Sequence, residues 1–259
     1  MILALPLLGE LRTCGPGKAL VPGPLARWWA GLGWPVVRVD APQWLPLWSG
    51  RAPDEAMLEA LGRPDFAVVV GQPTVAASLE AAGLTVRRVP VTPPQGVHQA
   101  SWLLGRPLDP RNLEVPLVRV SPAARQEETL LFPGSGGLHK CWPARRYAAL
   151  GRALVAAGRR VTVVLGPVEL ERGPGPEVFR GLSVLEAPDL AETAALCAGA
   201  ELVVGNDAGT THLAAVCGAR VLALFGPTDP ERWRPLGPRV RVLRESLDSL
   251  AVARVLEAC

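Results

Sequence analysis

The sequence predicts an α/β protein built from two parallel-sheet, Rossmann-like domains. Short apolar runs alternate with longer helical patterns along the chain, which is typical of βαβ units. Runs such as Val161–Leu165 are apolar on both faces, as strands covered by helices on both sides must be. The alternation is interrupted between Gly105 and Glu128, where prolines and a charged stretch indicate a linker. We therefore expect an N-terminal domain over residues 1–126 and a C-terminal domain over residues 127–259.

Each expected element follows from an apolar run or a helical period. The predicted strands are Ile2–Leu5, Val36–Val39, Phe66–Val70, Thr85–Val89, Thr129–Phe132, Arg160–Leu165, Ser183–Leu185, Glu201–Val204, Val221–Phe225 and Val240–Leu243. The predicted helices include Gly23–Ala30, Asp54–Leu61, Thr74–Ala82, Ala144–Ala157, Leu190–Ala198, Thr210–Cys217 and Leu247–Glu257.

Composition excludes several classes of protein. A hydrophobic fraction of 49% and a charged fraction of 20% suit packed cores and argue against disorder. The net charge of +3 comes without a basic stripe, so we expect no nucleic-acid partner. No apolar run approaches the ~20 residues of a membrane span. The apolar start, Met1–Pro6, lacks a basic region and is interpreted as a first strand rather than a signal peptide. Five cysteines without a CxxC pair suit reduced thiols in the cytoplasm, and no metal-ligand cluster is apparent.

Scarce residue types gather in two glycine-containing segments. Lys18 and Lys140 are the only lysines of the chain, and Asn206 is one of two asparagines. Lys140 lies beside a glycine loop, whereas Asn206 lies close to His212, one of three histidines. Chance, together with a biased nucleotide composition of the genome, is the alternative explanation for this distribution. A lysine retained beside a glycine loop nevertheless indicates a role that arginine cannot fill.

The first of these segments joins a strand to a helix through glycines. The strand ends at Phe132, the loop contains Ser135 and Gly136, and Pro143 stands where a helix would begin. Such loops offer backbone N–H groups to phosphate oxygens, and Lys140 would add a point charge on a diphosphate. An ordinary turn with a solvated lysine is the alternative. The segment is neither a Walker A loop nor a GxSxG elbow.

The second segment has the same strand, turn and helix order. A buried strand reaches Gly205, and a helix begins near Thr210, so that the first N–H groups of that helix point to the edge where open α/β sheets bind ligands. Asp207 would either contact the ligand or cap the helix. His212 faces either the site or the neighbouring strand. A third segment, Leu222–Pro230, places Thr228 and Asp229 in a turn or against a ligand.

Together the three segments resemble glycosyltransferase family nine, the ADP-heptose:lipopolysaccharide heptosyltransferases. The matching residues are Pro-Gly-Ser at 133–135, Lys-Cys-Trp-Pro at 140–143, Gly-Asn-Asp-Ala-Gly-Thr-Thr-His-Leu-Ala-Ala at 205–215 and Leu-Phe-Gly-Pro-Thr-Asp-Pro at 224–230. The resemblance covers about residues 130–235 and is faint before them. It implies the GT-B fold, in which two Rossmann-like domains face a cleft, and a reaction that needs no metal and no cofactor.

The resemblance also implies a donor site in the C-terminal half. Lys140 and the Ser135–Gly136 loop would contact the donor phosphates. The amides of Thr210 and Thr211 would bind the diphosphate, with Asp207, Gly209 and His212 lining the pyrophosphate and sugar pocket. Glu169, after the strand that ends at Leu165, would reach the donor ribose. Lys140 would stabilise the departing diphosphate, and both Lys140 and Asp207 are expected to be catalytic residues.

The first half departs from the family pattern at the proposed general base. Family members carry Leu-Gly-Asp after the first strand, whereas this chain has Leu-Gly-Glu at residues 8–10. Glu10 can accept a proton as aspartate does, although its extra methylene moves the carboxylate. We favour Glu10 as the base over a solvated loop residue, with Asp40 as the next candidate.

The function expected is an inverting transfer of a sugar, such as heptose, from a nucleotide-diphospho-sugar to a cell-envelope glycan or lipid-linked acceptor. The protein would be cytoplasmic and could lie at the inner membrane face. The alternatives are a non-catalytic nucleotide-sugar-binding protein and a sugar-nucleotide epimerase of similar fold.

Overall fold

The computed structural model contains two compact units, each described here by itself. It describes residues 5–21, 23–114, 118, 120–122, 128–173 and 175–259. The C-terminal unit comprises Gln95–Ser101 and Arg106–Cys259, and the N-terminal unit comprises Pro6–Pro94 and Trp102–Gly105. These limits differ from a division at residue 126. Within the C-terminal unit, Val118 N donates to Val216 O at 3.2 Å and Gly237 N donates to Pro110 O at 2.8 Å, so part of the expected linker packs on that unit.

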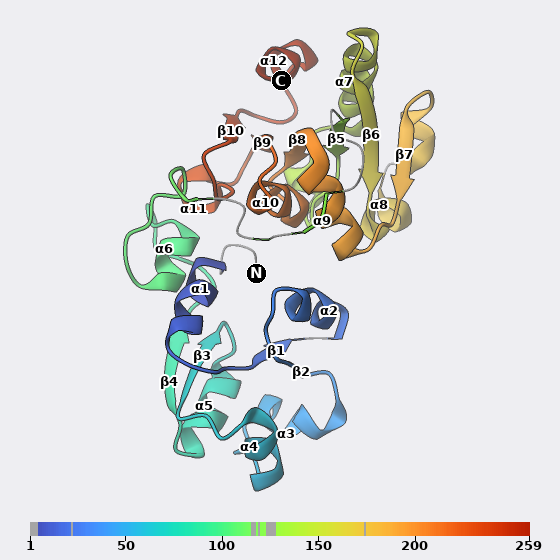
Figure 1. The fold of residues 1–259 in the computed structure, drawn as a ribbon. Helices are drawn as coiled ribbons and strands as arrows, with labels where there is room; N and C mark the ends of the chain where they lie inside the picture. Colours follow the sequence, from blue (N-terminus) through green and yellow to red (C-terminus); the bar gives the residue numbers. More distant parts are fainter. Residues whose placement is uncertain (1–4, 22, 115–117, 119, 123–127, 174) are drawn as a thin grey trace. The chain divides into compact units, whose positions relative to one another are not determined.

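A six-stranded parallel sheet forms the centre of the C-terminal unit (Figure 1). Its order is β10-β9-β8-β5-β6-β7, and every neighbouring pair is parallel. The strands are β5 (Glu128–Phe132), β6 (Arg160–Leu165), β7 (Ser183–Glu186), β8 (Ala200–Asn206), β9 (Val221–Phe225) and β10 (Val240–Arg244). All six were expected from the sequence, with bounds that agree within two residues.

Helices cover the sheet because its strands are apolar on both faces. The helices of this unit are α7 (Ala144–Ala156), α8 (Pro167–Arg172), α9 (Leu190–Gly199), α10 (Gly209–Val216), α11 (Pro230–Trp233) and α12 (Val252–Ala258). Helix α12 packs against α7, and α10 packs against α9 (Figure 1). One core joins alternate strand residues such as Leu131, Val163 and Leu222 to Leu150 of α7 and Val255 of α12. Residues at the alternate positions, such as Leu130 and Val203, are equally buried, which is why these strands lack an apolar-polar alternation.

The chain changes direction across this sheet between β5 and β8. From β5 it proceeds through β6 and β7 on one side, and it returns to pair β8 with the other side of β5. Open α/β sheets bind ligands at such a switch point, outside the carboxyl ends of the strands. The loop after β5 and the turn after β8 are therefore the first place to look for a site.

The N-terminal unit has two separate parallel strand pairs. Strands β1 (Ala19–Val21) and β2 (Val36–Arg38) form one pair, and β3 (Phe66–Val70) and β4 (Thr85–Val89) form the other. Its helices are α1 (Leu5–Thr13), α2 (Gly23–Gly31), α3 (Leu45–Trp48), α4 (Glu55–Leu61) and α5 (Pro73–Ala81), while α6 (Gln99–Leu104) is divided between the two units. A core around Trp44, Leu47 and Leu79 holds α3, α4 and α5 together.

The start of the chain differs from the prediction. Residues 1–4 of the expected strand Ile2–Leu5 lie outside the described residues, and Leu5 begins α1 rather than ending a strand. Glu10 consequently lies on a helix and not in a loop. The expected helix Leu247–Glu257 begins only at Val252, because the preceding residues form a turn that buries Leu247 and Leu250 in the core. None of the helices among the described residues has the length and apolar character needed to cross a membrane.

Candidate functional site

The loop after β5 and the turn after β8 interlock at the switch point. Ser135 Oγ donates to the backbone oxygen of Asp207 at 3.0 Å, and Lys140 Nζ donates to the same oxygen at 3.2 Å. Lys140 belongs to a single 3-10 turn, η3 (Leu138–Lys140), and its side chain reaches Asp207, the residue that follows β8. Residues about seventy positions apart in sequence thus form one surface at the carboxyl ends of two neighbouring strands.

Asp207 lies between Lys140 and His212. Its Oδ2 is 3.3 Å from Lys140 Nζ, and its Oδ1 is 3.4 Å from His212 Nε2. The side chains of Asp207 and His212 are each 10% exposed, and that of Lys140 is 26% exposed. Burial by itself raises the pKa of the Asp207 carboxyl, but the hydrogen bond and charge of His212 and the charge of Lys140 outweigh it, so the pKa is lowered below its ordinary value. Asp207 is therefore an ionised carboxylate that holds both partners in place.

Helix α10 directs unused backbone donors at the same place. Its N-cap is Ala208, whose side chain makes no hydrogen bond to the helix. Asp207 is therefore not the N-cap of α10, and the capping role considered from the sequence is wrong. The first helical donor is His212 N, which bonds Ala208 O at 3.2 Å. In the part of the chain that the structure describes, the N–H groups of Gly209, Thr210 and Thr211 make no such bond. These amides and the positive end of the helix dipole suit an anion.

Thr211 has a second role within this turn. Its hydroxyl donates to Asn206 O at 2.7 Å, and it is fully buried. Its side chain therefore serves the fold. Asp229, by contrast, accepts from Glu231 N at 3.2 Å and caps α11, which favours the turn over a ligand contact for that residue.

Glu169 reaches the same loop from the neighbouring strand. It lies on α8, and its Oε2 accepts at 2.9 Å from the N–H of Gly166, the N-cap of that helix. A Cβ on Gly134 would lie 2.8 Å from Glu169 Cγ and closer still to its carboxyl. A Cβ on Gly166 would lie 2.8 Å from Oε2, and one on Gly173 would lie 2.6 Å from Glu169 Cα. None of the three has a positive φ, so these glycines serve to make room for Glu169.

The predicted site residues of the C-terminal half are thus brought together, except that Gly136 makes no hydrogen bond with the others among the described residues. Gly136 is exposed in the loop, and a Cβ there would meet nothing within 4 Å. Sequence reasoning missed Asn206 and Gly134. The scarcity of asparagine was the one signal that pointed to Asn206, and nothing in the sequence shows that Gly134 faces Glu169.

Glu10 belongs to the other unit, on α1, where it is partly buried. Asp40, the next candidate, follows β2 and pairs with Arg38 at 3.0 Å. The hydrogen bond from Arg38 lowers the pKa of the Asp40 carboxyl. A carboxylate already held by a guanidinium is a weaker base, which argues against Asp40 in that role.

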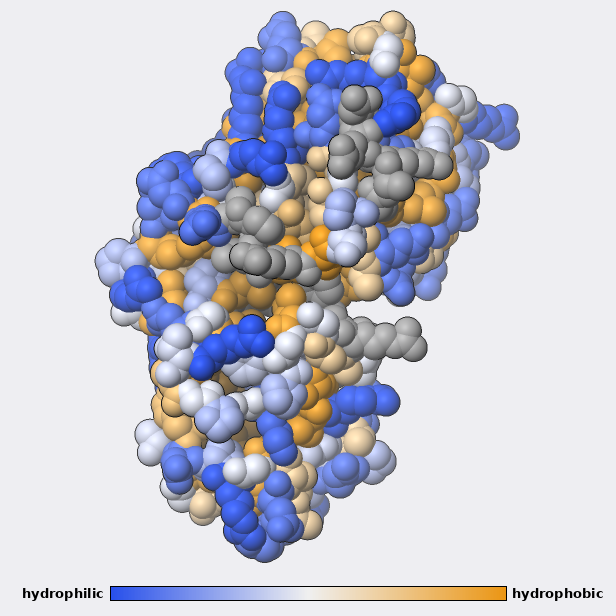
Figure 2. Space-filling view, in the orientation of Figure 1, coloured by the Kyte–Doolittle hydropathy of each residue, from blue (hydrophilic) through white to orange (hydrophobic). Residues whose placement is uncertain are grey.

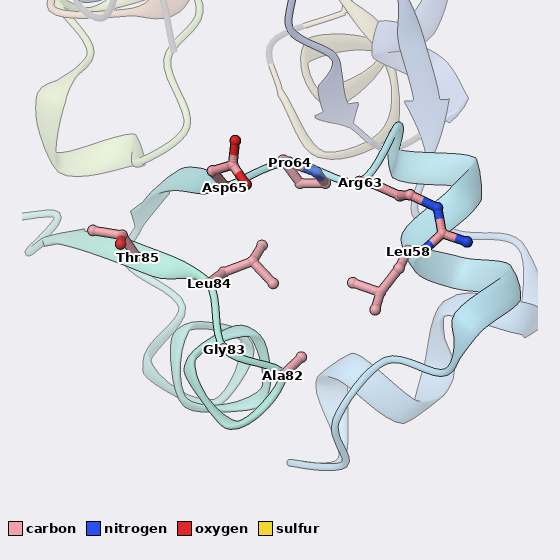
Figure 3. Close-up of a pocket in the computed structure, with 8 residues that line it drawn as sticks. All are labelled: Leu58, Arg63, Pro64, Asp65, Ala82, Gly83, Leu84 and Thr85. Carbon is pink, nitrogen blue, oxygen red and sulfur yellow. The ribbon is translucent and has the colours of Figure 1, made fainter.

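The N-terminal unit also contains a pocket of about 430 Å³ that holds none of the predicted site residues. Leu58 of α4 and Leu84 point into it, and Asp65 and Thr85 border it (Figure 3). It lies at the amino ends of β3 and β4, the edge opposite to that at which open α/β sheets bind ligands. Among the described residues there is no group of three or more His, Cys, Asp or Glu arranged to hold a metal ion.

The visible surface of each unit is mostly hydrophilic, with hydrophobic residues between (Figure 2). Exposed apolar side chains near the candidate site include Leu138 beside the glycine loop and Val168 beside Glu169. They are single residues on separate elements and do not by themselves define a surface.

Comparison with known proteins agrees with this geometry. The family model described as glycosyltransferase family 9 (heptosyltransferase) matches residues 111–254, which is more than half of the chain. This chain belongs to glycosyltransferase family 9. The matched region includes Lys140, Glu169 and the whole β8–α10 turn, so the family assignment rests on the part of the chain that forms the candidate site.

Among curated proteins, an Escherichia coli protein named lipopolysaccharide heptosyltransferase 3 is 31% identical over 143 residues. The alignment covers 52% of this chain and 39% of that protein, so the match spans well under half of the relative's length.

Solved structures of higher coverage show the fold. The structure of E. coli ADP-heptose lipopolysaccharide heptosyltransferase II has a TM-score of 0.73 at 19% identity, over 99% of this chain and 93% of the other. An E. coli heptosyltransferase with ADP has a TM-score of 0.75 at 19% identity, over 99% and 94%. The fold is α/β of the GT-B type, as the resemblance in sequence implied.

Proposed function

We propose that this chain is an inverting glycosyltransferase that takes a sugar from a nucleotide-diphospho-sugar. The observation that carries the proposal is the assembly of Lys140, Asp207 and the free amides of α10 at the switch point of the sheet. This combination offers a point charge, an orienting carboxylate and backbone donors within one surface. Those are the groups that a departing diphosphate requires.

The proposed donor is ADP-heptose. Support comes from the family, and from a structural neighbour, an E. coli heptosyltransferase solved with ADP. In the proposed arrangement, the diphosphate lies on Lys140 and on the amides of Thr210 and Thr211. His212 and Asp207 face the sugar end, and Glu169 accepts from the ribose hydroxyls. The carboxylate of Glu169 would repel a phosphate, but it can accept hydrogen bonds from ribose hydroxyls. Lys140 and the α10 amides can donate hydrogen bonds to the phosphates.

The reaction that we propose is a single displacement. An acceptor hydroxyl oxygen forms a bond to the anomeric carbon of the donor while the bond from that carbon to the diphosphate oxygen breaks. The acceptor proton passes to the Glu10 carboxylate, and the two electrons of the broken bond leave on the diphosphate. Lys140 and the α10 amides are fixed before the reaction and stabilise that developing charge, which is how preorganised donors act. The proposed reaction uses no cofactor.

The proposed acceptor is a lipopolysaccharide precursor, and the proposed place of action is the cytoplasmic face of the inner membrane. The name of the E. coli relative, lipopolysaccharide heptosyltransferase 3, supports this choice of acceptor.

Product analysis with purified full-length protein tests the proposal. ADP-heptose, another ADP-sugar and a UDP-sugar would each be incubated with a lipopolysaccharide core acceptor, and the products separated by mass spectrometry. Transfer of heptose with release of ADP is expected. An epimerised donor would replace the proposal with the epimerase alternative. Tight donor binding with neither transfer nor hydrolysis would favour a non-catalytic binding protein.

A further inference from the structure

Asn206 is the most fully bonded side chain of the candidate site, yet it has no place among the residues that touch the proposed donor. It is the last residue of β8 and is 0% exposed. Its Oδ1 accepts from Trp142 N at 2.9 Å and from Tyr147 OH at 3.1 Å. Its Nδ2 donates to Pro133 O at 2.8 Å and to Gly134 O at 3.3 Å.

The orientation of this amide is fixed by its partners. A backbone N–H can only donate and a backbone carbonyl can only accept, so Trp142 N selects the oxygen of Asn206 and Pro133 O selects the nitrogen. In a flipped amide, Nδ2 would face the N–H of Trp142, so that two donors would meet. Oδ1 would face the carbonyl oxygens of Pro133 and Gly134, so that acceptors would meet. The side chain therefore satisfies every partner in one orientation only.

These bonds attach both ends of the glycine loop to β8. Pro133 and Gly134 begin the loop and Trp142 ends it, so one side chain holds the loop at its entry and at its exit. The backbone oxygen of Asn206 accepts from Thr211 of α10 as well. Between the two attachments lie Ser135 and Lys140, which both bond the next residue, Asp207.

We propose that Asn206 is the positioning residue of the diphosphate site, whose side chain holds the glycine loop and Lys140 in the register needed for binding. This inference rests on the proposed function, since it concerns the same site. It assigns to Asn206 no contact with the donor. The effect of Asn206 on ligand affinity passes through the glycine loop that its side chain attaches to β8.

Asn206→Asp and Asn206→Ala test the inference in the full-length protein, with ADP and inorganic pyrophosphate as probes. Aspartate keeps the shape of asparagine but presents an oxygen to the carbonyls of Pro133 and Gly134. Alanine introduces no charge and releases the same carbonyls. Because buried groups without partners are unfavourable, we expect ADP affinity by calorimetry to fall by about tenfold or more in either variant, well below its unfolding temperature.

Tyr147→Phe is the matched control. It removes a buried bond to the same asparagine but leaves Nδ2 on Pro133 and Gly134, so the loop stays attached. We expect it to lower the unfolding temperature, because a buried hydrogen bond is lost. ADP affinity should stay within about twofold of wild type, because the bonds that hold the glycine loop remain.

A double-mutant cycle with Lys140→Ala separates positioning from general destabilisation. If Asn206 acts by placing Lys140 and its loop, Asn206→Ala should weaken ADP binding less in the Lys140→Ala background than in wild type. Additive losses, or unchanged affinity in both variants at position 206, would overturn the inference. So would failure of both variants to fold while Tyr147→Phe binds normally, because Asn206 would then serve folding alone. Absence of ADP binding by the wild-type chain would instead contradict the proposed function.

Discussion

Gly134→Ala should weaken nucleotide binding by displacing Glu169, although Gly134 itself has no side chain to contribute. The φ of Gly134 is not positive, so alanine can adopt the same backbone conformation. The added methyl group would lie 2.8 Å from Glu169 Cγ and closer to the carboxyl carbon. Ordinary carbon contacts are about 3.5–4.0 Å, so the carboxyl group must move by on the order of 1 Å.

The expected magnitude follows from the bonds that this displacement breaks. The Glu169 carboxylate would lose its bond from Gly166 N, now 2.9 Å long, and its proposed bonds to the donor ribose. A hydrogen bond to a charged group contributes about 1.5–3 kcal/mol, so loss of the ribose contact should weaken ADP binding by roughly 10- to 150-fold. Loss of the helix cap should also lower stability by about 1 kcal/mol.

Calorimetric titration of Gly134→Ala, Glu169→Ala and the double variant with ADP is the assay. Gly134→Ala should have little further effect once Glu169 is removed, because there is no carboxylate left to displace. An ADP analogue without the ribose hydroxyls should bind wild type and Gly134→Ala alike. Equal losses from Gly134→Ala in both backgrounds would mean that the methyl group clashes with the nucleotide directly, which would refute the reasoning.

Variants at three further positions test the remaining parts of the site. Lys140→Ala should weaken ADP binding, and Lys140→Arg should restore it only in part, because a planar guanidinium does not reproduce the compact ammonium group that bonds the backbone oxygen and Oδ2 of Asp207. Equal affinity of wild type and both variants by calorimetry would leave Lys140 as a surface residue. The pKa of Asp207 lies below the ordinary value of 3.8, so its carboxylate stabilises the fold above that pH, and this contribution disappears as the pH falls through the lower folded-state pKa. Asp207→Asn should therefore flatten the acid side of a plot of unfolding free energy against pH, and an unchanged slope would argue against the ion pairs. Glu10→Gln should lower kcat by about a hundredfold or more with donor affinity retained, and Glu10→Asp should keep activity; undiminished turnover by Glu10→Gln would place the base elsewhere.

The strands and helices of the C-terminal unit were predictable because their signals are local. A buried parallel strand is a short apolar run, and the runs that became β6 and β9 have the bounds expected from sequence. Glycine loops after β5 and β8 are equally visible, which is why Lys140, Asp207 and Thr210 could be proposed together. The N-terminal unit was less predictable. Strand β1 and helix α3 are short, and the helical conformation around Glu10 carries no periodic apolar pattern strong enough to distinguish it from a strand end or loop.

Sequence by itself therefore determined the class of fold, the family and the segments that form the candidate site. Only the tertiary structure decided which atoms in those segments meet. The side chain of Asn206 bonds residues more than sixty positions away, and Glu169 occupies the space that Gly134 leaves open, because strands β5, β6 and β8 are neighbours in the sheet. The order of the strands depends on the free energy of the whole packed unit, so it cannot be predicted from a local pattern of residues.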